Sequence, residues 1–386
     1  MPKTVLSIVS TLAHCGPVNG MKNVMRYLDP QKYRPVVATL SPEPACTFIN
    51  DFRSLGVPVM QMGMSRLGSL VSGARNLRRV ALAIKPDLVH SHGLRADVLA
   101  ACAGFDCPIV STVHSDLVQD YRFAYGRFVG PYAATRQYSE LRRFEGVNAV
   151  SAPLADLLSK LGIAARVITN GVESADYYPA PDMESARALR TSLGWPLDAV
   201  VVLHTGVLRS LKNPIAVVRG FRASKLSRHG FLVFAGDGPQ RAECEKAASH
   251  ASNILFLGKR KDISDLLRAA DILISASSSE GLGTALLEGC ASGIRVMASD
   301  IPAHRFIQQM FPDQVQIFIR GDASSVGTAL DGISEGDATK RFELSPSALE
   351  VISTRRMSRQ YQEFYSEILQ SPSRAASAPE GMLCRP

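Results

Sequence analysis

Short apolar runs alternate along this chain with longer segments whose apolar residues recur every three or four positions. The first runs, residues 5–9, 36–40 and 57–60, are rich in branched apolar side chains, which is typical of buried β-strands. Residues 67–84 carry the helical spacing instead. Strands that alternate with helices predict an α/β fold, with a parallel sheet covered by helices.

The segment 256–299 shows this alternation most clearly. Its expected elements are a strand ending at 257–258, a helix over 263–270, and strands over 272–275 and 294–298. A polar turn, residues 277–281, opens a second helix between the last two strands. Ligands of such sheets bind where a strand ends and the next helix begins. This turn is therefore the first candidate site.

Two carboxylates flank the start of that second helix. Glu280 lies in the turn and Glu288 on the helix, with seven residues between them. Eight positions make about two helical turns, so both side chains are expected on one side. The amides of Gly281, Gly283 and Thr284 are donors at the helix start, where an anion such as a diphosphate is favoured.

The chain length predicts two domains. A chain of 386 residues is long for one hydrophobic core, and a Pro-bearing linker near residue 177 divides it into 1–175 and 176–353. The spacing of apolar residues over 354–370 predicts a helix with an apolar stripe. Residues 371–386 are rich in Ser, Pro and Ala and predict a disordered tail.

Composition limits the partners. With 46% hydrophobic and 20% charged residues the chain is globular. The net charge of +8 suits acidic partners such as nucleotide phosphates or anionic lipids. No nucleic-acid-binding motif accompanies this charge, so nucleic acid is not expected as a partner.

The cellular location is predicted to be the cytoplasm. The seven Cys are scattered, as expected of free thiols in a reducing compartment. No apolar run reaches the roughly 18 residues that span a bilayer. The chain opens directly on a strand, with no signal peptide before it.

The turn and helix that carry Glu280 and Glu288 resemble the signature of the retaining GT-B glycosyltransferases of family 4. That signature is a Glu, seven residues and a second Glu, followed by a small-residue helix and a Gly before a strand. The resemblance implies two Rossmann-like doubly wound domains facing a cleft, with helix 354–370 crossing back to the first domain. It also implies that Glu280 contacts the donor sugar and Glu288 the nucleotide ribose.

Further motifs extend the resemblance over most of the chain. They are Asn170-Gly171, Gly206 to Lys212, Gly236 to Pro239 and Leu257-Gly258. By the resemblance, Gly206, Gly236, Gly258 and Lys259 line the donor site. The turn and helix start at Leu282, Gly283 and Thr284 line it as well.

Arg209 and Lys212 are candidate phosphate ligands. They lie three residues apart in the loop after a strand, from which both can reach the crevice. The resemblance implies that they stabilise the departing diphosphate. The family commonly has Arg directly after the Gly, where this chain has Val207. Lys212 keeps its usual distance from Gly206.

The first domain contributes weaker candidates. Gly16 and Gly20 lie in a loop, 14–20, that fits a phosphate-binding turn or an ordinary strand-to-helix connection. The resemblance implies that Gly20 faces the donor phosphates. His114 follows a strand, where a His is either a ligand contact or a hydrogen-bonded structural group.

The resemblance implies that His114 lies near the sugar and the acceptor, which makes it a catalytic candidate. His90 and His92 are lesser candidates.

Two basic segments fit a membrane surface. Helix 67–84 carries Arg75, Arg78 and Arg79, a face that either rests on anionic lipid or is simply solvated. Residues 121–143 interleave aromatics with Arg, a pattern that suits single-stranded nucleic acid, a membrane interface or an acceptor pocket. The family's acceptor lies near this second segment, which favours the last two.

The predicted function is transfer of a sugar from a UDP- or GDP-linked donor to a glycan or lipid-linked acceptor in polysaccharide or cell-surface glycan biosynthesis. Retention of configuration is expected, at the cytoplasmic face of a membrane. No cofactor and no metal are expected, because the chain has no Asp-x-Asp motif.

Three alternatives stay open. A nucleotide-sugar epimerase of the same fold would need no acceptor. A non-catalytic membrane-surface scaffold would need no donor. A dinucleotide-dependent oxidoreductase needs a fuller glycine fingerprint than Gly16 to Gly20.

Overall fold

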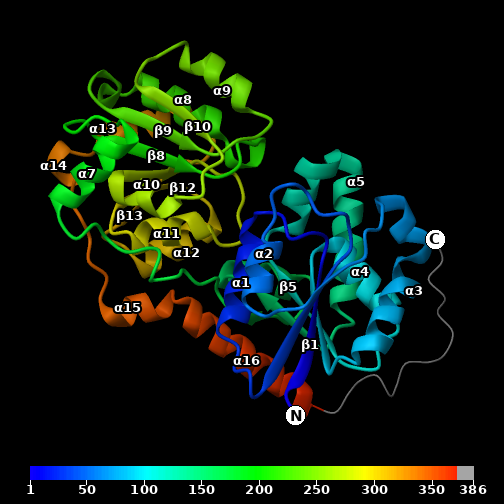
Figure 1. Ribbon diagram of the computed structural model, residues 1–386. Helices are drawn as coiled ribbons and strands as arrows, with labels where there is room; N and C mark the ends of the chain where they lie inside the picture. The colour runs from blue at the N-terminus through cyan, green and yellow to red at the C-terminus, as the bar shows by residue number, and fades with distance from the viewer. Residues whose placement is uncertain (372–386) are drawn as a thin grey trace. The chain divides into compact units, whose positions relative to one another are not determined.

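The computed structural model describes residues 1–371, which form two compact units (Figure 1). Unit 1 is Met1–Gly171 with the segment that begins at Thr354, and unit 2 is Val172–Ser353. The boundary lies after residue 171, where the sequence predicts it after residue 175. Val172 and Ser353, the first and last residues of unit 2, pair in a bridge. The chain therefore enters and leaves unit 2 at neighbouring points. Apart from Ser371, the predicted tail lies outside the described residues.

Unit 1 contains a parallel sheet of seven strands in the order β3-β2-β1-β4-β5-β6-β7. The strands are β1 Lys3–Val9, β2 Tyr33–Thr39, β3 Val59–Gln61, β4 Leu88–His92, β5 Ile109–Val113, β6 Gly146–Ala149 and β7 Arg166–Val167. Side chains of β1 alternate between two cores: Val5 and Val9 lie in one cluster, Leu6 and Ile8 in the other. Both faces of the sheet are therefore buried.

Helices cover this sheet. They are α1 Gly16–Arg26, α2 Ile49–Ser54, α3 Arg66–Ile84, α4 Leu94–Cys102, α5 Leu117–Leu141, α6 Ala152–Lys160 and α16 Thr354–Gln370. The predicted loop 14–20 is wrong, because α1 begins at Gly16. Pro17 lies in its first turn, where the ring's fixed φ suits a helix start.

The C-terminal helix α16 belongs to unit 1, as predicted. Its Met357, Tyr361, Phe364 and Tyr365 join the core cluster of β1 and α1. The Tyr365 hydroxyl is 2.8 Å from His90 Nδ1. Apolar burial and buried hydrogen bonds thus hold together two segments at opposite ends of the chain.

Helix α5 is broken at Gly126, whose φ of 85° and ψ of 174° are not helical. A Cβ added at Gly130 would lie 2.4 Å from the Tyr121 carbonyl oxygen. The chain therefore doubles back at Gly126, and the two arms pack closely. This turn was not predicted from the sequence.

Unit 2 repeats the architecture with six parallel strands in the order β10-β9-β8-β11-β12-β13. The strands are β8 Val201–Thr205, β9 Phe231–Ala235, β10 Ile254–Gly258, β11 Ile272–Ser275, β12 Arg295–Ser299 and β13 Val315–Phe318. The helices are α7 Met183–Leu193, η1 Ser210–Lys212, α8 Pro214–Ala223, η2 Lys225–Arg228, α9 Arg241–Ala248, α10 Ile263–Ala269, α11 Thr284–Ala291, α12 Pro302–Met310, α13 Ala323–Asp331, α14 Glu335–Ala338 and α15 Pro346–Val351. The two sheets confirm the predicted α/β class.

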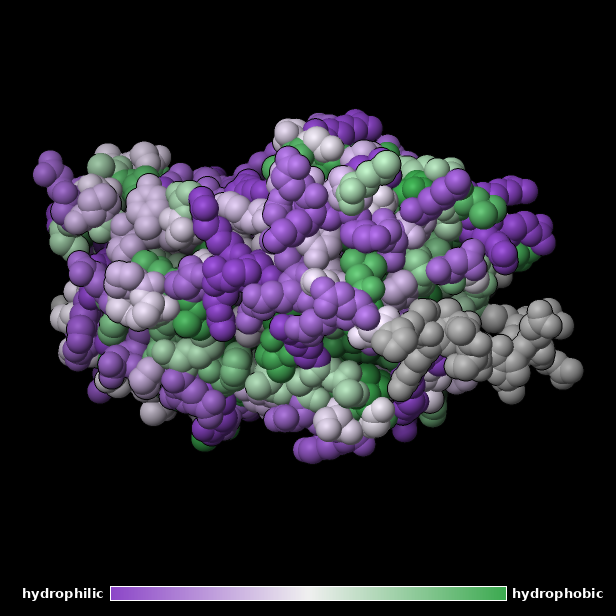
Figure 2. All heavy atoms as spheres, turned by 90° about the horizontal axis from the view of Figure 1, so that it is seen from below, coloured by the Kyte–Doolittle hydropathy of each residue, from purple (hydrophilic) through white to green (hydrophobic). Residues whose placement is uncertain are grey.

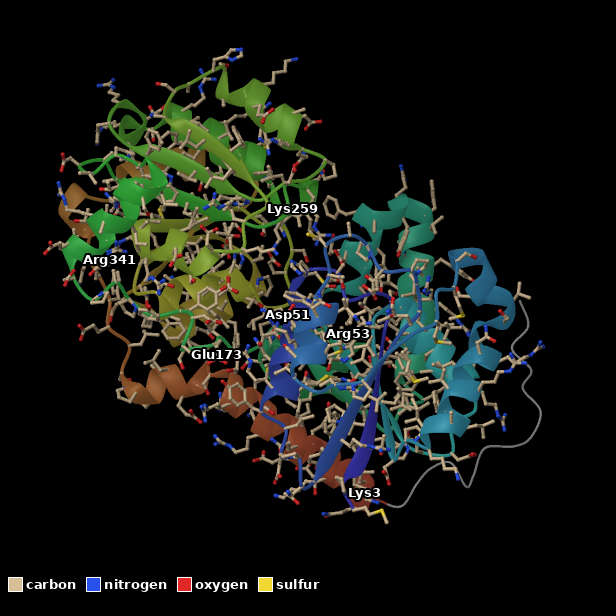
Figure 3. The ribbon with its side chains drawn as sticks, viewed as in Figure 1. Lys3, Asp51, Arg53, Glu173, Lys259 and Arg341 are labelled. Atoms are coloured by element: carbon tan, nitrogen blue, oxygen red, sulfur yellow. The ribbon has the colours of Figure 1, made fainter. Side chains whose placement is uncertain are left out.

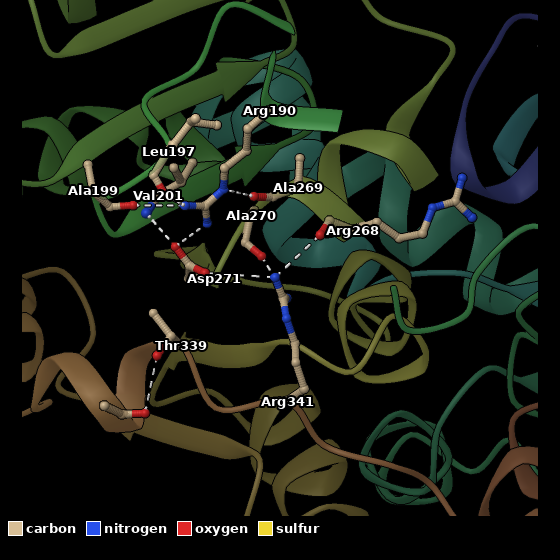
Figure 4. Close-up of polar contacts among 11 residues, drawn as sticks. Arg190, Leu197, Ala199, Val201, Arg268, Ala269, Ala270, Asp271, Thr339 and Arg341 are labelled. Atoms are coloured by element: carbon tan, nitrogen blue, oxygen red, sulfur yellow. Dashed lines mark hydrogen bonds and ion pairs between the residues drawn. The ribbon is translucent and has the colours of Figure 1, made fainter. Parts of the chain in front are cut away.

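A buried charge cluster fastens the start of two central strands in unit 2 (Figure 4). Asp271, just before β11, accepts hydrogen bonds from Arg190 Nη2 at 2.5 Å and from the Val201 amide at 2.8 Å. Arg341 Nη2 lies 3.7 Å from its other oxygen. Arg190 also donates to the carbonyls of Ala269 and Ala199.

The surface is mixed in character. On the face drawn in Figure 2, hydrophobic residues lie between hydrophilic ones. Within residues 1–371, no helix combines the length and apolar character needed to cross a bilayer. Of the cysteines in this range, Cys244 and Cys290 are buried, while Cys15 and Cys46 are exposed.

Candidate functional site

The loops that carry most predicted site residues leave the same edge of the sheet in unit 2. All six strands are parallel, so their carboxyl ends share one edge. The strand order reverses between β8 and β11, and ligands of doubly wound sheets bind at such a point. Lys212 follows β8 and Glu280 follows β11.

Three glycines let the loops at this edge approach one another closely. A Cβ added at Gly236 would lie 1.8 Å from the Gly206 carbonyl oxygen, so no other residue fits there. Gly206 itself has a φ of 120°, which favours glycine. Gly236 also bridges Gly258, which ends β10. Gly206, Gly236 and Gly258 therefore lie together; that they line a donor site stays a prediction.

Lys212 and Glu280 form an ion pair between Nζ and Oε1. The Ser277 hydroxyl donates to the same Glu280 oxygen at 2.7 Å. Burial would raise the pKa of Glu280, but the charge of Lys212 and these hydrogen bonds hold it below its usual value. The pair is thus charged, and it fixes two side chains that the sequence proposed separately.

A hydrogen-bond chain continues from Glu280 into the neighbouring strand. The Ser299 hydroxyl, at the end of β12, donates to the Ser277 carbonyl at 2.6 Å. His304 Nδ1 lies 2.9 Å from the Ser299 carbonyl oxygen. A carbonyl only accepts, so this imidazole nitrogen carries the proton. Burial lowers the pKa of His304 to about 4, so its ring is neutral.

Glu288 lies on α11 and contacts a residue of the linker. The Tyr177 hydroxyl is hydrogen-bonded to its carboxyl group. Burial raises the pKa of Glu288 to about 7, although Tyr177 and the charge of Lys212 both lower it. A carboxyl group with this pKa is poised between its two protonation states near neutral pH.

The geometric argument from helical turns is wrong for the two carboxylates. Helix α11 begins at Thr284, so Glu280 precedes it and is not two turns away on the same helix. What relates Glu280 to Glu288 is Lys212, whose charge acts on both carboxyl groups.

The remaining residues predicted in unit 2 lie around this pair. Leu282 is buried and Gly283 caps α11 with a φ of 91°, which places Thr284 in the first turn. Arg209 is exposed and precedes η1. Lys259 is exposed just after β10 (Figure 3).

In unit 1, the half-buried His114 lies beside two buried histidines, His90 and His92. His114 Nε2 lies 3.3 Å from His92 Nδ1, and His90 Nε2 lies 2.8 Å from Thr112 Oγ1. Burial lowers the pKa of His114 to about 4, so the ring is neutral. His92 and His90, lesser candidates from the sequence, thus set the surroundings of His114.

Gly20 lies on α1 rather than in a loop, so the predicted strand-to-helix phosphate loop is wrong at this position. A Cβ there would lie 3.5 Å from Asn170 Oδ1. Gly20, Asn170, His92 and His114 line one small cavity of unit 1, of about 10 Å³, which is room for roughly one water molecule.

Several polar residues of this region were missed from the sequence: Tyr177, Ser277, Ser299, His204 and His304. Ser277 and Ser299 follow or end strands at the site edge, a signal that sequence alone offers. Tyr177 offered none, because its partner Glu288 is distant in the chain. His304 follows its partner Ser299 by only 5 residues, but no motif marks this pair. No group of His, Cys, Asp and Glu within the described 1–371 is arranged to hold a metal; that no metal takes part stays a prediction.

Both units match models of known protein families. The family described as Glycosyltransferase Family 4 matches residues 16–176, and Glycosyl transferases group 1 matches residues 185–315. Together they cover most of the chain.

Two curated relatives are enzymes of glycolipid synthesis. The alpha-monoglucosyldiacylglycerol synthase of Streptococcus pneumoniae is 28% identical over 277 residues, 68% of this chain and 61% of that protein. The phosphatidyl-myo-inositol mannosyltransferase of Mycolicibacterium smegmatis is 27% identical over 65% of this chain and 63% of that protein. The chain thus matches less than two thirds of either relative.

Solved structures show the same fold. HepE of Anabaena, in complex with UDP-glucose, superposes with a TM-score of 0.77 at 19% identity, over 94% of this chain and 99% of that one. Sucrose-phosphate synthase of Thermosynechococcus elongatus superposes with a TM-score of 0.78 at 17% identity, over 97% and 100%. Both domains therefore have the GT-B type of fold.

Proposed function

Because this chain belongs to the family 4 glycosyltransferases of GT-B fold, we propose that it transfers a sugar from a nucleotide-sugar donor to a glycan or lipid-linked acceptor. The observation that carries the proposal is the Lys212–Glu280 ion pair at the switch point of unit 2. The relatives named above act on lipid acceptors by their names, which supports an acceptor of that class.

The groups of unit 2 suit a departing diphosphate. Negative charge grows on the diphosphate as the bond to the anomeric carbon breaks. Lys212 supplies a fixed cation, and the first turn of α11 supplies amide donors and the positive end of a helix dipole. Glu280 is held by Ser277 and Lys212 and is our candidate for orienting sugar hydroxyls. The proposal assigns no step to a metal.

The stereochemical proposal is retention. The acceptor oxygen then bonds to the anomeric carbon on the face that the diphosphate leaves, and the acceptor proton passes to the departing phosphate oxygen. In unit 1 the neutral His114 is our candidate for contact with the sugar or the acceptor.

The donor site is tested by calorimetry with UDP, GDP and ADP. We expect one nucleoside diphosphate to bind, with UDP first because HepE was solved with UDP-glucose. Lys212→Ala should weaken binding by about tenfold or more, since it removes a charge-assisted contact. The matched control is Lys225→Ala, because Lys225 is exposed in η2, before β9 rather than after a strand.

Other outcomes point to the alternatives. A folded protein that binds no nucleoside diphosphate contradicts the transferase and favours the scaffold. Conversion of a nucleotide-sugar into its epimer without any acceptor identifies the epimerase instead.

We further propose that the turn of α5 rests on an anionic membrane surface. Five of its large apolar side chains are exposed, with Phe128 at 77% and Tyr132 at 73%. Arg122 and Arg127 are exposed beside them, and no acidic residue lies between 121 and 139. Aromatics with adjacent arginines suit the boundary between headgroups and acyl chains.

The membrane proposal is tested with phosphatidylcholine vesicles, with and without phosphatidylglycerol. Binding should require the anionic lipid and fall about tenfold in Phe128→Ser/Tyr132→Ser, since two apolar anchors are lost. Val71→Ser on α3, where Val71 is 87% exposed, tests the other basic segment. If only Val71→Ser loses binding, the membrane contact lies on α3 and not on the turn of α5.

A further inference from the structure

The turn that carries Glu280 rests on a buried histidine. His304 has no exposed surface. A Cβ added at Gly283 would lie 3.3 Å from His304 Cδ2 and 3.5 Å from Nε2. The ring therefore lies directly beneath the N-cap of α11, between the end of β12 and the turn.

Each bond from His304 toward Glu280 has a defined direction. The His304 Nδ1–H donates to the Ser299 carbonyl at 2.9 Å. The Ser299 hydroxyl donates to the Ser277 carbonyl at 2.6 Å. The Ser277 hydroxyl donates to Glu280 Oε1 at 2.7 Å. Helix α12, the end of β12 and the turn are thereby joined through His304, Ser299, Ser277 and Glu280.

The other ring nitrogen is not used in this chain. His304 Nε2 is buried and has no hydrogen-bond partner. Leaving a buried acceptor unpaired costs free energy, so a residue whose only task were to fill space would be better apolar. The Nδ1 bond to Ser299 is the feature that an apolar residue cannot supply.

We propose that His304 is a positioning residue that fixes the Ser299–Ser277 hydrogen bonds and thereby orients Glu280 toward the donor sugar. This inference rests on the proposed function. It goes beyond that function because it gives His304 on α12 an indirect role in sugar binding, without contact to the substrate. Loss of the His304 bond to Ser299 should therefore weaken binding of the nucleotide-sugar, while binding of the free nucleotide stays unchanged.

Two substitutions separate the ring nitrogens. In His304→Asn the side-chain amide nitrogen takes the place of Nδ1 and can still donate to Ser299. In His304→Gln the amide lies at the position of Nε2, and the Nδ1 bond is lost. The measurement is the ratio of the Kd for UDP-glucose to the Kd for UDP, by calorimetry. GDP-mannose and GDP replace them if the nucleotide screen selects guanine.

The ratio should stay within about twofold of wild type in His304→Asn and rise about tenfold in His304→Gln, the effect of roughly one hydrogen bond. Ser299→Ala should raise it as well. The double variant Ser299→Ala/His304→Gln should add little, because residues of one network are not additive. Gln314→Asn is the matched control: Gln314 is buried, and its amide donates to the Ile294 carbonyl at 2.8 Å, just before the amino end of β12, whereas Glu280 follows the carboxyl end of β11.

The outcomes are distinguishable. If the Kd ratio stays at the wild-type value in His304→Gln but rises in His304→Asn, the ring acts through Nε2, which overturns the proposal. Equal ratios in all variants, or an equal rise in Gln314→Asn, overturn it too. A wild-type protein that binds UDP but not UDP-glucose also contradicts it. Failure to bind any nucleotide is instead the failure of the proposed function.

Discussion

Glu280 and Glu288 carry the same carboxyl group in different surroundings. Glu280 pairs with Lys212 and accepts from Ser277, so its pKa lies below the usual value despite burial. Glu288 has Tyr177 as its hydrogen-bond partner, and burial raises its pKa to about 7. The difference decides which of them responds to pH in the physiological range.

Nucleotide affinity should therefore depend on Glu288 near neutral pH. If ribose hydroxyls donate to its carboxylate, the ligand favours the ionised form, and affinity falls as pH drops below about 7. Between pH 7 and 6 we expect up to a tenfold rise in the Kd for the bound nucleotide. Glu288→Gln should bind more weakly and show no such dependence. A pH dependence that persists unchanged in this variant would contradict the assignment.

Gly236 is irreplaceable for steric reasons. Its missing Cβ would meet the Gly206 carbonyl at 1.8 Å, and backbone cannot move aside cheaply. Gly236→Ala should lower the free energy of unfolding of unit 2 by about 2–3 kcal/mol, as overpacking does. Gly16→Ala, with nothing within 4 Å of the added atom, should be neutral or slightly stabilising. Urea unfolding of both variants checks this, and equal losses would contradict it.

At the scale of elements, α5 is held in its doubled-back form by a buried carboxyl group. Asp97 of α4 accepts from Ser91 at 2.5 Å and from Gln137 at 2.5 Å. Gln137, on the second arm, in turn accepts from Tyr121 on the first. Asp97 has no exposed surface, and burial raises its pKa to about 6.

This raised pKa makes stability depend on pH. The folded state favours the protonated form of Asp97, so its contribution is fully present below the ordinary pKa of 3.8 and is lost as pH rises through about 6. Asp97→Asn mimics the protonated form.

The difference in unfolding free energy between Asp97→Asn and wild type should thus grow in favour of Asn from pH 4 to 7, by up to about 3 kcal/mol. Urea unfolding at a series of pH values measures it. A difference that stays constant over this range would show that Asp97 does not titrate there.

The whole molecule contains two units with separate cores, and each has its own buried polar cluster. In unit 2, Asp271 joins Arg190 and Arg341 (Figure 4). Burial lowers the pKa of Arg341, while Asp271 raises it. Removing the single carboxylate would leave two guanidinium groups without their shared partner.

Asp271→Ala should therefore destabilise unit 2 by about 3–5 kcal/mol, the cost of breaking a buried ion pair from one side. Amide hydrogen exchange, resolved along the chain, should show faster exchange in β8 and β11 while β1 and β4 of unit 1 keep their protection. The surface variant Asp198→Ala, which loses only an exposed pair with Arg187, is the control. Equal loss of protection in both units would show that they unfold as one.

The sequence determined the elements that depend on local pattern. The strand predicted over 272–275 is β11, and the basic helix predicted over 67–84 lies within α3. Both could be predicted because an element that buries one or both faces has apolar residues at a regular, short spacing. The signature turn with Glu280 was also visible in one stretch of chain. The early start of α1 and the break of α5 were not, since one proline and one glycine changed the backbone within otherwise uniform segments.

Only the tertiary structure decided which side chains meet. Lys212 and Glu280 are 68 residues apart, and they touch because β8 lies beside β11. Glu288 meets Tyr177, and His304 lies beneath Gly283, for the same kind of reason. Strand order follows from how the whole sheet packs its two faces and not from any local period. The sequence therefore shows which single residues can carry the chemistry. The fold decides which partners set the charge and the orientation of each residue.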